Sequence, residues 1–145
     1  MRSLFAAAAL AATVLTAGSA AAQASGSYFI TNNASSPVTL SANSLANNGS
    51  VSFPATINAG ATVFASATQT SSSNVYVGTF IYRDVNGVGC NFTTTVIRSS
   101  STRRYSFSFS AAPYSSSSTA VCTMTASTTN PNTGSYSANA SMSGF

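Results

Sequence analysis

The chain has 145 residues and a formal net charge of +4, and 4% of its residues are charged. His, Glu, Lys and Trp are absent, and Asp84 is the single acidic residue. This composition excludes a Ser-His-Asp triad, a pair of catalytic carboxylates and a zinc site with its usual ligands. General acid–base catalysis would have to rely on one carboxylate. We therefore expect a protein that is not an enzyme and that holds no metal and no cofactor.

Residues 1–24 have the pattern of a secretory signal peptide. Arg2 provides a positive start, residues 4–15 form an apolar run, and residues 20–22 (Ala-Ala-Ala) or 22–24 (Ala-Gln-Ala) provide a cleavage site. The run is shorter than the roughly 20 residues that a membrane-spanning helix needs, although an anchored helix remains the alternative. An Ala-rich leader of this kind is typical of bacteria. We expect an exported protein that is secreted, periplasmic or at the cell surface, without a transmembrane segment in its mature chain.

Residues 25–145 are predicted to form a single β domain. Apolar residues alternate with Ser, Thr or Asn in short segments, which is the pattern of strands with one buried face. Low charge together with low hydrophobicity could indicate disorder, but disordered chains are poor in aromatic and β-branched residues, and this chain contains many. The predicted strands are residues 27–32, 36–40, 51–53, 61–68, the two arms of a hairpin within 75–97, and then 105–111, 120–126 and 135–143.

The hairpin is the strongest of these signals. Two β-branched and aromatic runs flank Asp84-Val85-Asn86-Gly87, and a three-residue loop starting after Asp84 would place Gly87 in the left-handed conformation. A loop of two or four residues would scatter the apolar groups, whereas the three-residue loop gathers them on one face. The pairs it creates are Tyr82 with Cys90, Phe80 with Phe92, and Tyr76 with Val96. Asp84, Asn86 and Gly87 are thus expected to form the turn, with Asp84 hydrogen-bonded to the turn backbone.

About nine short strands, with no helix after the leader, indicate an all-β fold. We predict an antiparallel two-sheet β-sandwich of the Ig-like or Greek-key type, in which each sheet buries one face, with a closed barrel as the second possibility. The small inward alanines of residues 135–143 are expected to pack against a bulky neighbour, such as the face of Tyr105 to Phe109. The segment from Tyr28 to Phe92 resembles small secreted β-sandwich proteins, without a motif that would name a family.

Cys90 and Cys122 are the two cysteines of the chain, and both lie in strand-like segments. Disulfides persist in exported proteins, so we predict a bridge between two strands, across or within a sheet. A metal pair or a reactive thiol is the alternative, but no His or acidic residue lies nearby in the sequence to complete either.

Arg98, Arg103 and Arg104 form the candidate anion-binding site. They lie in a polar connection between two strong strand signals, where a tight hairpin end would bring their guanidinium groups together. Arginine presents a fork of donors that matches phosphate, sulfate or carboxylate, and the single acidic residue can neutralise at most one of them. The alternative is a solvated loop whose charges aid solubility.

The composition leaves three functional hypotheses. The first is a non-enzymatic binding or interaction module for a glycan or an anionic surface. The second is a fimbria-type structural subunit that self-associates by strand addition, because uncharged strand edges do little to block pairing. The third, a membrane-active toxin-like β-sandwich, depends only on the resemblance noted above. Four arginines after the leader are too few for a nucleic-acid surface, so we expect no nucleic-acid partner.

Overall fold

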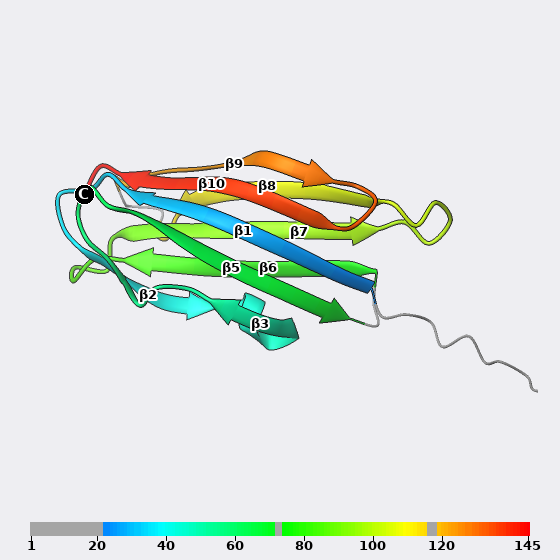
Figure 1. Ribbon diagram of the computed structural model, residues 1–145. Helices are drawn as coiled ribbons and strands as arrows, with labels where there is room; N and C mark the ends of the chain where they lie inside the picture. Colours follow the sequence, from blue (N-terminus) through cyan, green and yellow to red (C-terminus); the bar gives the residue numbers. More distant parts are fainter. Residues whose placement is uncertain (1–21, 72–73, 116–118) are drawn as a thin grey trace, which may run out of the picture.

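The computed structural model describes residues 22–71, 74–115 and 119–145. Its strands form two five-stranded sheets that face each other (Figure 1). The first sheet has the order β3-β5-β1-β10-β9 and the second the order β4-β2-β6-β7-β8. The predicted all-β, two-sheet sandwich is therefore confirmed. The strands are β1 (Ala22–Asn32), β2 (Val38–Asn43), β3 (Gly49–Ser52), β4 (Thr56–Ile57), β5 (Thr62–Ser71), β6 (Val75–Arg83), β7 (Gly89–Arg98), β8 (Tyr105–Pro113), β9 (Val121–Asn130) and β10 (Ser135–Ser143).

The observed elements differ from the predicted ones at three places. The two-residue strand β4 follows Pro54 and was not predicted, and a 3₁₀ helix, η1 (Ser44–Asn48), separates β2 from β3. Strand β1 begins at Ala22, five residues before the predicted start, so it extends into the predicted signal peptide. Residues 1–21, the greater part of that peptide, lie outside the described residues. Within the described residues, no helix is long and apolar enough to cross a membrane.

The first sheet is mixed, because β1 and β10 pair in parallel, from Ser25 opposite Ser135 to Asn32 opposite Met142. Every other strand pairing among the described residues is antiparallel, as predicted. The parallel pair places the first and last strands side by side, with β5 on one flank and β9 on the other (Figure 1). Both ends of the described chain are thereby held in the interior of a sheet.

The β6–β7 hairpin has the predicted register. Tyr82 lies opposite Cys90, Phe80 opposite Phe92, and Tyr76 opposite Val96. All six side chains are at least 99% buried. The apolar face of the hairpin is thus the inner face of the second sheet, as the alternation of residue types predicts.

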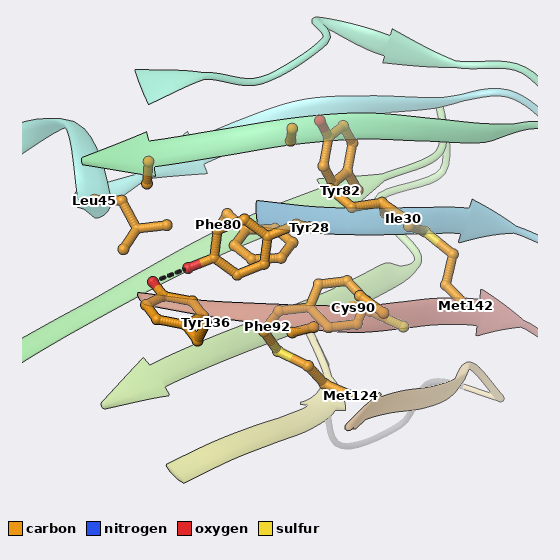
Figure 2. Packing of buried hydrophobic residues seen from close by; sticks show 14 of the residues in the cluster. Tyr28, Ile30, Leu45, Phe80, Tyr82, Cys90, Phe92, Met124, Tyr136 and Met142 are labelled. Atoms are coloured by element: carbon orange, nitrogen blue, oxygen red, sulfur yellow. Dashed lines mark hydrogen bonds between the residues drawn. The ribbon is translucent and has the colours of Figure 1, made fainter. Parts of the chain in front are cut away.

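Aromatic rings from the two sheets meet in the core (Figure 2). Tyr28 of β1 packs edge-on against Phe80 of β6 with 5.2 Å between ring centres, and Phe80 stacks on Phe92 of β7 at 5.0 Å. Tyr136 of β10 lies 5.8 Å from the Tyr28 ring. Edge-to-face and offset-stacked pairs at these distances add about 0.5–1.5 kcal/mol each beyond the area that they bury.

The hydroxyl groups of this cluster are also paired. The Tyr28 hydroxyl donates to Oγ1 of Thr94 in the second sheet at 3.2 Å, and the Tyr136 hydroxyl therefore donates to Tyr28 at 2.6 Å. A buried hydroxyl without a partner would cost about 1–3 kcal/mol, so the pairing allows tyrosine where phenylalanine would otherwise be expected. Gly26 makes room for it, because a Cβ at Gly26 would lie 2.3 Å from the Tyr136 ring.

The last strand meets the β8 face through the same tyrosine. Phe107 and Phe109 of β8 point inward, as the alternation predicts, and lie 5.7 Å and 5.5 Å from the Tyr136 ring. The strand thus meets this face through Tyr136, a bulky residue near its start, whereas the prediction named its small alanines.

The predicted disulfide is present and joins the two sheets. Cys90 lies on β7 and Cys122 on β9, with 5.7 Å between their Cα atoms. Cys90 is fully buried. The bridge lies near one edge of the sandwich, where β8 and β9 are the outermost strands of their sheets.

Replacing both cysteines by alanine should lower the free energy of unfolding by about 3–4 kcal/mol on the chain-entropy model, because the cross-linked residues are 32 positions apart. For a domain of this size we expect the melting temperature to fall by roughly 10–20 °C. Calorimetry of the double variant measures the change, and the reduced wild-type protein is the control. Equal melting temperatures for the three samples would contradict a stabilising bridge.

Alkaline pH should unfold the protein through its buried tyrosines. Burial raises the pKa of Tyr28, Tyr82 and Tyr136 above the ordinary value of 10.0, and for Tyr136 the neighbouring Tyr28 raises it further. The folded state then keeps phenolic protons that the unfolded state releases above about pH 10, so stability is full below that pH and decreases as the pH rises beyond it.

Circular dichroism and tyrosinate absorbance should therefore change together above about pH 10. In the variant Tyr82→Phe the decrease of stability with pH should be less steep, because one raised pKa is removed. Ionisation of all six tyrosines without loss of the β-sheet signal would contradict this expectation.

Candidate functional site

Three arginines lie at one end of the sandwich, which we call the arginine end. Arg98 is the last residue of β7, and Arg103 and Arg104 lie in the loop of residues 99–104 that leads to β8. This loop, drawn in yellow, projects beyond the sheets at the end where β1 begins and β9 turns into β10 (Figure 1). The structure thus places the three residues of the candidate anion-binding site at the same end.

The loop is held by its own hydrogen bonds. The backbone N–H of Ser99 donates to the carbonyl of Arg104 at 2.8 Å, and that of Arg103 donates to the carbonyl of Ser99 at 3.0 Å. The Ser99 hydroxyl oxygen accepts from the backbone N–H of Thr102 at 3.2 Å. These bonds close a compact turn, so the two arginines that it carries project from a defined backbone.

Tyr105, the first residue of β8, fastens the loop to the first sheet. Its backbone N–H donates to the carbonyl of Pro131 in the β9–β10 turn at 2.7 Å. Its hydroxyl donates to the carbonyl of Gln23 in β1 at 3.2 Å. The arginine end is therefore built from three segments that are far apart in the sequence.

Arg103 has an unusual backbone conformation. Its φ angle is 59°, in the left-handed region, and it is the one non-glycine residue of the described chain with a positive φ. A side chain in this region costs on the order of 1 kcal/mol relative to glycine. Strained residues of this kind gather at functional sites. Arg103 is also exposed to solvent.

Arg98 differs from the two loop arginines. It is half-buried, and its guanidinium carbon lies 5.7 Å from the centre of the Tyr105 ring opposite it in the β7–β8 pair. Its backbone N–H donates to the carbonyl of Asn74. A cation over an aromatic face is attracted by the ring quadrupole. Arg98 is therefore packed on the domain, whereas Arg103 and Arg104 are exposed to solvent.

Asp84 lies in the hairpin turn at the opposite end of β7. Its Oδ1 accepts from the backbone N–H groups of Asn86 at 2.9 Å and Val88 at 2.8 Å, and its Oδ2 accepts from the Asn86 side chain at 3.2 Å. Gly87 has a φ of 80°, as the predicted loop requires. A carboxylate can accept about four hydrogen bonds, and three of those of Asp84 come from groups of the turn.

The charges are segregated along the sandwich. Arg83, on the Asp84 end, places its guanidinium carbon 4.6 Å above the Tyr114 ring. Strand β7 spans 10 residues, so Asp84 lies roughly 30 Å from the loop arginines at about 3.4 Å per residue. Exposed charges are screened over about 10 Å at 0.1 M salt. The carboxylate therefore does not neutralise the arginine end.

Sequence reasoning missed two exposed apolar groups because it followed the inward face of each strand. Phe29 and Phe64 form an edge-on pair on the outer face of the first sheet, with 5.6 Å between ring centres. Val75, Val77 and Ile97 are 49%, 51% and 44% exposed on the outer face of the second sheet. The sequence did contain a signal for these three residues, because they alternate along their strands with the buried residues Tyr76 and Val96 and so had to face outward.

Among residues 22–71, 74–115 and 119–145, no three His, Cys, Asp or Glu side chains gather where a metal ion could bind. No protein-family model matches the chain, and no curated protein matches it. Arguments about function therefore depend on the geometry described above.

Replacing Asp84 by Asn should change the free energy of unfolding by about 1 kcal/mol or less, because the amide oxygen can still accept from the turn backbone. Asp84→Ala removes these acceptors and should cost roughly 1–3 kcal/mol. Denaturant unfolding of the two variants measures the difference. Equal stability of Asp84→Ala and wild type would show that the turn does not depend on the carboxylate.

Proposed function

We propose that this protein is a non-enzymatic binding module that docks on an anionic surface through the loop of residues 99–104. The observation that carries the proposal is the exposure of Arg103 and Arg104 at an end of the molecule without an acidic side chain. An exposed guanidinium group without an internal partner is free to bind an external anion in bidentate fashion.

The segregation of charge supports this proposal. Three of the four arginines that follow the leader lie at the arginine end, and the fourth shares the opposite end with Asp84. A net charge confined to one end produces a field that orients an approaching partner. The loop hydroxyls of Ser99, Ser101 and Thr102 provide neutral polar groups beside the arginines.

Among the described strands, the topology disfavours the first and the last as donors in a fibre. Strand donation needs a terminal segment that can leave its own domain and pair with the edge of another. Strands β1 and β10 are both interior strands, each with a neighbour on either side. Removing either one would break two ladders, so neither is a suitable donor. The single carboxylate, engaged in a turn, also favours a binding role over a catalytic one.

Export by the leader fits the same scheme. Ala24 is buried, and the carbonyl of Gln23 accepts the Tyr105 hydroxyl. Cleavage after Ala22 would keep both residues in the domain, whereas cleavage after Ala24 would remove them. We propose cleavage after Ala22, which would leave the new amino terminus at the arginine end and add a positive charge there. The mature protein would be secreted, periplasmic or at the cell surface.

The double variant Arg103→Asn, Arg104→Ser should lose binding to immobilised anionic polymers and to anionic vesicles. Asn tolerates the left-handed conformation found at position 103, so the melting temperature should stay nearly constant. Binding of the wild type should weaken as salt rises, because exposed charges are screened. Retention on an anionic resin as a function of salt measures the effect.

The control is Arg83→Ser, which removes an arginine at the opposite end, and it should bind almost like the wild type. Equal losses in Arg83→Ser and in the double variant Arg103→Asn, Arg104→Ser would show that net charge, and not this loop, determines binding. Binding that survives both the double change and high salt would exclude the loop as the site.

A further inference from the structure

An aliphatic patch lies on the outer face of the second sheet, next to the arginine end. It consists of Val75, Val77 and Ile97, each about half exposed. Val75 and Ile97 are direct partners in the β6–β7 ladder, and Val77 follows on the same face two residues along β6. The three side chains therefore form one continuous apolar surface.

The patch adjoins the arginine loop through the covalent chain and through the ladder. Ile97 immediately precedes Arg98, and Val75 follows Asn74, whose carbonyl accepts the backbone N–H of Arg98. On the same face, Ile97 lies opposite Ser106 of β8. Beyond this rim the face is polar, because Thr95 and Ser108 occupy the next outward positions beside Val77.

We infer that the arginine end docks on an anionic lipid surface, with the arginines at the headgroups and the aliphatic patch in the interface. This inference depends on the proposed anionic binding and names its partner. A soluble polyanion would match the guanidinium groups but leave the valines and the isoleucine in water. A bilayer offers anionic headgroups directly above hydrocarbon, so charge and apolar surface are matched together.

The dimensions agree with shallow docking. Val75 is the first residue of β6 and Ile97 the penultimate residue of β7, so both lie at the rim. Val77 lies about 7 Å further from the rim, at about 3.4 Å per residue. Interfacial apolar faces enter the headgroup and acyl boundary by about 5–10 Å. The patch ends where the polar outer face of the sheet begins.

The other exposed apolar pair does not offer this combination. Phe29 and Phe64 lie on the outer face of the first sheet, surrounded along the ladders by Ser66, Thr62 and Asn139. No arginine belongs to that sheet, since the four arginines of the described chain lie on β6, β7 and the loop after β7. Charge complementarity therefore favours the patch at the arginine end.

The test compares vesicles of phosphatidylcholine with vesicles that also contain phosphatidylglycerol, using the variant Val77→Thr, Ile97→Thr. Threonine keeps the β-branched shape and strand propensity, so the fold should be retained. We expect the variant to bind anionic vesicles about tenfold more weakly, because the apolar contacts are lost, and to bind an immobilised sulfated polymer like the wild type. At high salt the wild type should keep more vesicle binding than the variant.

The matched control is Val85→Thr, Val121→Thr, which makes the same chemical change at two exposed valines, 94% and 58% exposed, near the opposite end. It should bind anionic vesicles like the wild type. Equal binding of wild type and Val77→Thr, Ile97→Thr would overturn the lipid inference, as would wild-type binding to the polymer without binding to vesicles. In both of those results the proposed anionic binding stands. Binding to neither surface would overturn the proposed function itself.

Discussion

The contact between Tyr28 and Phe80 is the interaction on which the sandwich most depends. It joins the centre of the first sheet to the centre of the second, and the hydroxyl chain from Tyr136 through Tyr28 to Thr94 crosses the same interface. Phenol rings bury a large area, and paired hydroxyls remove the penalty of burying oxygen. The core can thus contain several tyrosines. The disulfide then joins the two sheets through Cys90, which is buried in the same core.

The four arginines of the described chain fall into two pairs, one packed on tyrosine rings and one exposed to solvent. With 4% charged residues, the fold cannot depend on ion-pair networks, and hydroxyl and amide groups provide most of the hydration of its surface. Two arginines are packed on tyrosine rings, Arg83 on Tyr114 and Arg98 on Tyr105. The other two are presented to solvent by a strained, hydrogen-bonded turn. This division separates arginines that stabilise the domain from arginines that can bind a partner.

The two ends of the sandwich differ in charge and in apolar surface. The amino-terminal strand starts there, the exposed arginines project there, and the aliphatic patch adjoins it, whereas Asp84 and the end of β10 lie at the opposite end (Figure 1). A surface that binds this end would contact the outer face of the second sheet only at the aliphatic patch and would leave the outer face of the first sheet accessible. The exposed phenylalanine pair of the first sheet would remain in solvent in that orientation.

The sequence by itself determined the β class, the hairpin register and the disulfide, because period-two alternation, the Asp84 to Gly87 turn and the cysteine pair are local or compositional signals. It also placed the three arginines at one end of the predicted hairpin, although Arg98 is the last residue of β7 and only Arg103 and Arg104 lie in the loop. It could not show that β1 pairs with β10 in parallel, or that Arg98 rests on Tyr105 while Arg103 stays exposed. Those features arise from contacts between residues far apart in the chain. The aliphatic patch belongs to the tertiary structure for a related reason: alternation places Val75, Val77 and Ile97 on the outer face, but only the packed structure shows that these side chains stay about half exposed there.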